Sequence, residues 1–206
     1  PRDEKDIIRG TQSSGIGQVL STGDILNTML KEVFTDVDIY DDYIRLLQYQ
    51  FVSPIGSTAI SFYHFYIEDT TYVDKDKCYH LQFIPANQQD FGFRGELYVL
   101  ADSTLHVRKV NLYMPKKSDV NWIDDMRIEQ EYTKLSNGEW VLTQDDMIAE
   151  IHTTKLLQDL LVVRTTRLSD YQFDAMPKQL FWGKAKVKHD ADAYNRGEDF
   201  WNTYRQ

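Results

Sequence analysis

The run of residues from Tyr79 to Ile151 constrains the fold of this chain more than any other feature. Apolar and polar residues alternate along it, and the tight turn Ser136-Asn137-Gly138-Glu139 joins its two longest arms. Asn-Gly between alternating residues is a strong hairpin signal, because both residues tolerate the positive φ that a type I′ turn requires. A long hairpin with one apolar face curves around whatever covers that face, so the run predicts a large curved antiparallel sheet.

A two-residue loop at Asn137 and Gly138 also predicts the register of this hairpin. The expected pairs on one face are Leu135–Trp140, Thr133–Leu142, Glu131–Gln144, Glu129–Asp146 and Arg127–Ile148, and on the other Tyr132–Thr143, Ile128–Met147 and Met126–Ala149. The first face carries the charge and the second is apolar. We take the apolar face as a candidate lining for a hydrophobic ligand, formed by Trp122, Met126, Ile128, Tyr132, Val141, Met147 and Ile151.

Composition limits the classes of partner. The chain has 206 residues, of which 42% are hydrophobic, enough for the core of one domain. Its formal net charge of −9 argues against nucleic acid and against an anionic lipid surface. Cys78 is the single cysteine, which excludes an internal disulfide, and no run approaches the roughly eighteen apolar residues of a membrane helix. The abrupt start at Pro1 leads us to expect a fragment of a longer protein.

The remaining segments predict three helices and a simple domain organisation. An apolar stripe from Ile25 to Phe34 predicts a helix that packs on or lids the sheet, the pattern from Ile39 to Phe51 predicts a short helix, and residues 192–204 predict a terminal one. We expect a linker or arm over residues 1–20, a half-barrel domain over 21–188, and a C-terminal helix or linker over 189–206.

Seven strands are expected between the helices. The period-two segments are Ala59–Asp69, Cys78–Ile84, Phe93–Ala101, Leu105–Met114, Val120–Leu135, Glu139–Thr153 and Gln158–Phe173. Consecutive hairpins of this kind form a meander. The predicted fold is therefore α+β: a curved antiparallel sheet, or open half-barrel, with helices packed on or lidding its concave face.

Several short motifs, spread in order along the chain, resemble those of a known family. They are Ser53-Pro54-Ile55, the strand from Tyr63 to Thr70, Tyr79-x-Leu81-x-Phe83-x-Pro85, Phe93-x-Gly95-x-Leu97-Tyr98-Val99, Ile128-Glu129-Gln130-Glu131-Tyr132, and Phe200-Trp201 with Arg205. Together they resemble the middle region of an uncharacterised Bacteroidetes outer-membrane protein family. A shorter part of the chain is similar to periplasmic lipoprotein-sorting proteins, whose fold is an open half-barrel with helices over an apolar cavity.

The resemblance implies a location and partners. In that family a carboxypeptidase-regulatory-like domain precedes this region and a membrane β-barrel follows it, which implies a domain of the cell envelope on the periplasmic side of the outer membrane. The expected partners are these two neighbouring domains and a lipid or hydrophobic peptide. The family has no assigned catalytic residues, so the resemblance implies neither a catalytic site nor a cofactor.

Two constellations of residues suggest chemistry. A first hairpin that turns near Asp74 would bring His64 and His80 together, with Cys78 nearby, as a weak candidate for a metal site that lacks a fourth ligand. The pair Glu129 and Asp146 is the arrangement by which a hydrolase raises the pKa of one carboxyl group. Solvated or hydrogen-bonded strand residues explain the histidines and Cys78 better than a metal site does, and a charged face turned to water explains the carboxylates better than a catalytic pair does.

Three functions therefore stay open. The sheet is a non-catalytic binding module for a lipid, acyl chain or peptide, or a structural spacer whose hollow a helix fills; an enzyme that uses the paired carboxylates is the alternative. A third reading, in which the strands belong to a membrane barrel, is disfavoured because Arg127, Glu129 and Arg164 interrupt the outward apolar bands that such strands need.

Overall fold

The computed structural model describes residues 5–12, 14, 35–46, 49–87, 89–114, 123–151 and 160–205. The chain divides into two compact units. One combines Pro1–Asn27 with Tyr171–Gln206 and is called the terminal unit below; the other, Thr28–Asp170, contains the sheet. No helix among the described residues is long and apolar enough to cross a membrane.

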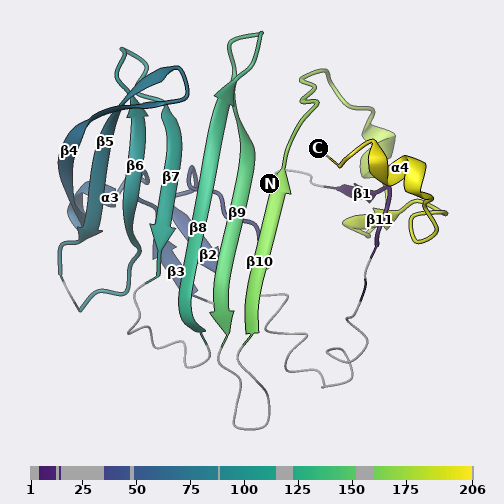
Figure 1. Cartoon of the computed structure of the whole chain (residues 1–206), viewed down its shortest axis with the longest axis horizontal. Coiled ribbons are helices and arrows are strands. Elements are labelled where there is room, and N and C mark those ends of the chain that lie inside the picture. The colour runs from purple at the N-terminus through teal and green to yellow at the C-terminus, as the bar shows by residue number, and fades with distance from the viewer. Residues whose placement is uncertain are drawn as a thin grey trace, which may run out of the picture. The chain divides into compact units, whose positions relative to one another are not determined.

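A seven-stranded antiparallel meander forms the centre of the larger unit (Figure 1). Its strands are β4 (Tyr63–Val73), β5 (Asp76–Pro85), β6 (Arg94–Leu100), β7 (Val107–Tyr113), β8 (Ile123–Lys134), β9 (Trp140–Ile151) and β10 (Leu160–Arg167). Each strand pairs with its neighbours in the chain, and the sheet is open, with β4 and β10 at its edges. The predicted α+β class and curved meander are confirmed, and so are the seven strands, with shifted ends.

The β8–β9 hairpin differs from its predicted form near the turn. The Leu135 amide donates to the Glu139 carbonyl at 2.8 Å, so three residues form the loop, and only Gly138 has a positive φ, of 92°. This is the geometry of a three-residue loop that ends in a bulge, not of a type I′ turn. The predicted pairs Leu135–Trp140, Thr133–Leu142 and Tyr132–Thr143 are therefore wrong.

A second bulge restores the predicted register farther from the turn. The pairing shifts by one residue between Glu131 and Tyr132, which leaves Thr143 as the additional residue on β9. Beyond that point Glu131 pairs with Gln144, and the pairs Glu129–Asp146, Ile128–Met147, Arg127–Ile148 and Met126–Ala149 follow as predicted. One face of the hairpin is buried and the other carries the charged residues, as expected.

A β-hairpin replaces the helix predicted from Ile39 to Phe51. The strands β2 (Tyr43–Leu46) and β3 (Tyr49–Val52) pair antiparallel, with Ile44 opposite Phe51. Ile44 and Leu46 are buried while Tyr43 and Arg45 are exposed, so the burial period is two. A short run of this kind matches both a helical and an extended pattern, and β-branched and aromatic residues favour the strand.

The helices are short. The helix α3 (Ala59–Phe62) occupies residues predicted as the start of a strand, and β4 begins directly after it. The predicted helix from Ile25 to Phe34 lies outside the described residues. In the terminal unit, α4 (Glu198–Asn202) covers only the central part of the helix predicted over residues 192–204, and the 3₁₀ turn η1 spans Lys178–Phe181.

The terminal unit joins segments from both ends of the chain. Within residues 1–20, expected to be a linker or arm, β1 (Asp6–Ile8) pairs in parallel with β11 (Val187–His189). The Thr11 amide donates to the Ala193 carbonyl at 2.7 Å, and the Arg196 guanidinium donates to the Arg9 carbonyl at 2.6 Å. These bonds hold the two segments together, and Ala193 is the buried residue among the described residues of this unit.

Candidate functional site

The apolar face of the sheet, proposed from the sequence as a ligand lining, is covered by the chain itself. Of the seven residues named for that face, Met126, Ile128, Tyr132, Met147 and Ile151 are buried. They belong to one cluster with residues from the segment that precedes the sheet, namely Val37, Ile39, Ile44, Leu46 and Phe51. Trp122 lies outside the described residues.

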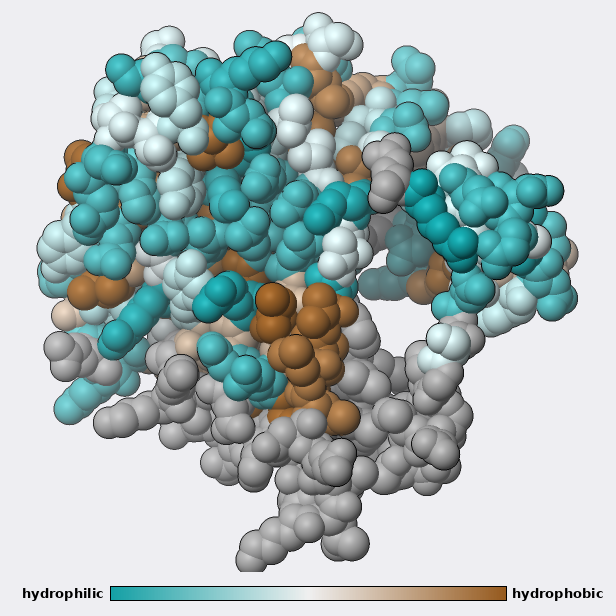
Figure 2. Space-filling view, viewed as in Figure 1, coloured by the Kyte–Doolittle hydropathy of each residue, from teal (hydrophilic) through white to brown (hydrophobic). Residues whose placement is uncertain are grey.

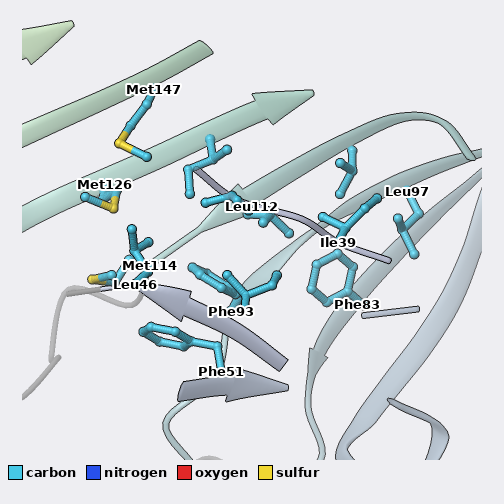
Figure 3. Close-up of a cluster of buried hydrophobic side chains, with 14 of the residues drawn as sticks. Ile39, Leu46, Phe51, Phe83, Phe93, Leu97, Leu112, Met114, Met126 and Met147 are labelled. Atoms are coloured by element: carbon cyan, nitrogen blue, oxygen red, sulfur yellow. The ribbon is translucent and has the colours of Figure 1, made fainter. Parts of the chain in front are cut away.

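The β2–β3 hairpin supplies the covering side chains. Figure 3 shows Leu46 and Phe51 near Met126 of β8 and near Phe93 and Met114, which directly precede β6 and follow β7, respectively. The rings of Phe51 and Phe93 stack with centroids 4.3 Å apart. All these side chains are at most 4% exposed. Stacked rings and interlocking methionines fill the space that a ligand would need.

Val141 does not belong to this face. The bulge at Thr143 pairs Val141 with Thr133 and places Leu142 beside Tyr132. Leu142 and Trp140 pack against the core instead of Val141. Val141 was assigned to the apolar face because the sequence analysis assumed a two-residue loop at Asn137-Gly138. The loop has one additional residue, which moves the side chains of β9 between the loop and the bulge to the opposite face.

A buried polar network on the same face escaped the sequence analysis. The Gln130 amide nitrogen donates to the Val37 carbonyl at 2.7 Å and to Asp145 Oδ1 at 3.2 Å. The Arg164 guanidinium donates to Asp145 Oδ2 at 2.5 Å and to the Thr35 carbonyl at 3.1 Å. Gln130 and Asp145 are buried, so their hydrogen bonds offset the cost of removing them from water. The network ties residues 35–37 to the sheet.

Burial affects the pKa of one member of this network and of a second anchor. Burial raises the pKa of Asp145 above its ordinary value, although the charge of Arg164 opposes that shift. Tyr63 donates its hydroxyl to the Val52 carbonyl at 2.7 Å, which fastens β3 to β4. Burial raises the pKa of Tyr63 as well. Both groups therefore act as structural hydrogen-bond partners.

A polar depression of about 430 Å³ lies along residues 35–50. Four aspartates line it, Asp36, Asp38, Asp41 and Asp42, together with Arg45. A hydrogen bond from the Ser57 amide to Asp42 holds the pKa of that carboxyl below its ordinary value. None of the six proposed ligand-lining residues that the structure describes borders this depression. It is large enough for a small ligand, but its lining suits water and ions rather than an acyl chain.

The three residues proposed as metal ligands do not converge. His64 pairs with Ile84, whereas His80 lies opposite Asp69, several residues farther along β4. Cys78 is fully buried, and burial raises the pKa of its thiol. No group of three or more potential ligands that could hold a metal occurs in the described part of the chain. The turn does lie at Asp74, as predicted. His64 is more residues away from that turn than His80 is, so the two histidines do not face each other across the hairpin.

Each carboxylate of the proposed catalytic pair has its own cation. Glu129 and Asp146 are opposite each other as predicted, but Lys109 Nζ lies 2.8 Å from Glu129 Oε1. Arg167 binds both oxygens of Asp146, at 2.5 and 3.1 Å. Burial lowers the pKa of Lys109, yet its bonds to Glu129 and to Glu131 outweigh burial and raise it. Each carboxylate of the proposed pair is therefore held in an ion pair with a cation of the same face.

The charged face also holds a stacked pair of rings on β5 and β6. The rings of His80 and Tyr98 are parallel, with centroids 4.6 Å apart. His80 Nδ1 lies 3.3 Å from Asp69 and its Nε2 lies 3.6 Å from Glu96, which accepts a hydrogen bond from Asn111 at 2.9 Å. In Figure 2 the sheet face is largely hydrophilic, with a hydrophobic patch over β9 and β10. Ile148, Leu161 and Val163 are the exposed apolar residues there.

One of three comparisons with known proteins gave a match. Residues 18–163 match the profile of DUF5686, described as a family of unknown function. Comparison with curated proteins and with solved structures found no match. The matched residues include the covered apolar face and the cation-paired carboxylates, and the family description assigns neither of them a role.

Proposed function

The chain belongs to the DUF5686 family, whose function is unknown, and we propose that it serves as a non-catalytic structural spacer domain of the cell envelope. The observation that carries this proposal is the covered face of the sheet. Met126, Ile128 and Met147 are at most 1% exposed and belong to one buried cluster with residues of the segment that precedes the sheet. A domain that fills its own hollow is suited to holding neighbouring domains apart.

The location is part of the same proposal. The motifs from Ser53 to Tyr132 resemble the middle region of a Bacteroidetes outer-membrane family, which supports a place on the periplasmic side of the outer membrane. In that arrangement the partners are the preceding carboxypeptidase-regulatory-like domain and the following membrane barrel of the full-length protein. Cation-paired Glu129 and Asp146 support the non-catalytic part of the proposal.

Binding of a lipid or hydrophobic peptide would require the hairpin to leave the sheet. That movement would expose Phe51 and its partner Phe93 and break the bond between Gln130 and the Val37 carbonyl. Burying one large apolar side chain stabilises a fold by about 1.5–3 kcal/mol, so several such side chains hold the hairpin closed. The closed hairpin is therefore more stable than the displaced hairpin that ligand binding would require, which favours the spacer over the binding module.

The test is a search for a bound apolar ligand. We expect native mass spectrometry of the gently purified chain to give the mass of the polypeptide alone, and a fluorescent fatty acid to show no saturable binding. Two matched variants show which face of the sheet holds any ligand that is found. Met147→Ala changes the covered face, and Ile148→Ala changes the outer face. Stoichiometric binding that Met147→Ala weakens and Ile148→Ala does not would overturn the spacer.

A further inference from the structure

The terminal unit carries a surface that its own packing does not explain. Within residues 173–188, which we call the aromatic-basic surface, large apolar side chains stand in water: Phe173 is 58% exposed, Met176 57% and Trp182 71%. Single exposed apolar residues are ordinary on soluble proteins, but several in one short stretch mark an interaction site. Nearly every residue of this stretch is exposed.

The backbone of this surface is held in place. In η1 the Leu180 amide donates to the Pro177 carbonyl at 3.0 Å, and the Trp182 amide donates to the Gln179 carbonyl at 3.2 Å. Lys5, from the other end of the chain, donates from Nζ to the Trp182 carbonyl at 2.8 Å. Trp182 is therefore presented to solvent by a turn that is already ordered, which lowers the entropy cost of binding.

The charge of the surface is opposite to that of the whole chain. Four lysines, Lys178, Lys184, Lys186 and Lys188, accompany a single acidic residue, Asp174, in a chain of net charge −9. None of the four lysines forms an ion pair within the part of the chain that the structure describes.

Arginines hold three of the carboxylates that follow this stretch in the chain. Arg196 lies 2.6 Å from Asp192 and 3.3 Å from Asp190, and Arg205 lies 2.9 Å from Glu198. Asp174 lies within the stretch and Asp6 lies opposite Val187, so the four lysines outnumber the acidic residues there and leave an excess of positive charge for an external anion.

We propose that the aromatic-basic surface docks on the interface of a bilayer that contains anionic phospholipid. Tryptophan and neighbouring apolar side chains favour the boundary between headgroups and acyl chains, while lysines reach the phosphates with their apolar stems still buried. A second copy of the chain is a poorer occupant, since a symmetric contact would bring lysines against lysines.

The net charge of −9 repels an anionic surface from most of the chain, so contact with the bilayer is restricted to this stretch. The same repulsion makes that contact weak and dependent on salt concentration. The inference concerns the terminal unit and does not rest on the spacer proposal for the sheet.

Vesicle flotation with the full chain tests the inference. We expect the chain to float with vesicles of phosphatidylcholine containing roughly 30% phosphatidylglycerol, not with phosphatidylcholine alone, and to be released by roughly 0.5 M salt. Each lysine near an anionic surface contributes roughly fivefold in partitioning. The charge-reversed variant K184E/K186E/K188E should therefore lose more than roughly a hundredfold.

Matched variants separate local from overall charge. K75E/K77E/K134E changes the net charge equally at exposed lysines of the sheet unit, and should retain binding much closer to wild type. Trp182→Ser should weaken binding, whereas Ile60→Ser, at a residue 88% exposed, should not. Circular dichroism checks that each variant is folded.

Three results would overturn the inference. The first is wild-type flotation that does not depend on phosphatidylglycerol. The second is equal loss of binding in both lysine variants. The third is a concentration-dependent dimer in analytical ultracentrifugation that Trp182→Ser dissociates, which would assign the surface to a second copy of the chain.

Discussion

Gly95 is the residue at which the sheet tolerates least change. A Cβ atom at this position would lie 1.9 Å from the Asn111 carbonyl oxygen and 2.8 Å from the Phe83 ring. The first of these atoms belongs to the backbone of β7 and cannot rotate away. Gly95 therefore permits β6 to approach β7 while the Phe83 ring packs over it.

We expect Gly95→Ala to lower the free energy of unfolding by about 3 kcal/mol, since an overpacked core costs that amount when the backbone must shift. Urea denaturation measures the change. Gly197→Ala is the matched control: nothing lies within 4 Å of its added Cβ, and its φ is −74°. The control should stay within about 0.5 kcal/mol of wild type. Equal stability of the two variants would mean that β6 and β7 are not closely packed at Gly95.

At the scale of elements, the sequence predicted what depends on local pattern. All seven strands of the sheet follow from period two and from turn residues, which act over a few positions. The β2–β3 hairpin was missed because Tyr40, Tyr43 and Ile44 also fit a helical spacing. Its extended form depends on packing against Phe93, far along the chain, which no local pattern contains.

The candidate site shows the same limit. Met126, Ile128 and Met147 could be placed on the buried face from the register, but what covers that face could not. The sequence analysis gave Gln130 and Asp145 no place in the core, although both are buried and Gln130 bonds to Val37 of the covering segment and to Asp145. Polar residues on a core face interrupt the alternation that sequence analysis relies on.

The hairpin that covers the sheet should be as stable as the sheet. In native-state hydrogen exchange we expect the amides of β2 and β3 to open with a free energy close to that of β8, because one buried cluster joins them. The mostly exposed strands β1 and β11 provide the internal comparison and should exchange much faster. Rapid exchange of β2 and β3 beside a protected β8 would reveal a lid and favour the ligand-binding reading.

At the scale of the whole molecule, the division into two units predicts unequal stability. The residues that form the large buried cluster, from Val37 to Ile151, all lie within Thr28–Asp170. The terminal unit instead depends on a parallel pair of three-residue strands and on a few side-chain bonds. A two-stranded sheet is marginally stable in water unless something else packs against it.

We therefore expect the fragment of residues 28–170 to unfold in one cooperative transition, with a free energy of unfolding within about 1 kcal/mol of the same transition in the full chain, because independent sites contribute additively. Urea denaturation followed by circular dichroism measures both proteins. The slope of this transition with urea should be unchanged, since the same surface is exposed when the sheet unit unfolds. A fragment that fails to fold would show that the terminal unit stabilises the sheet, and that the two units form one cooperative structure.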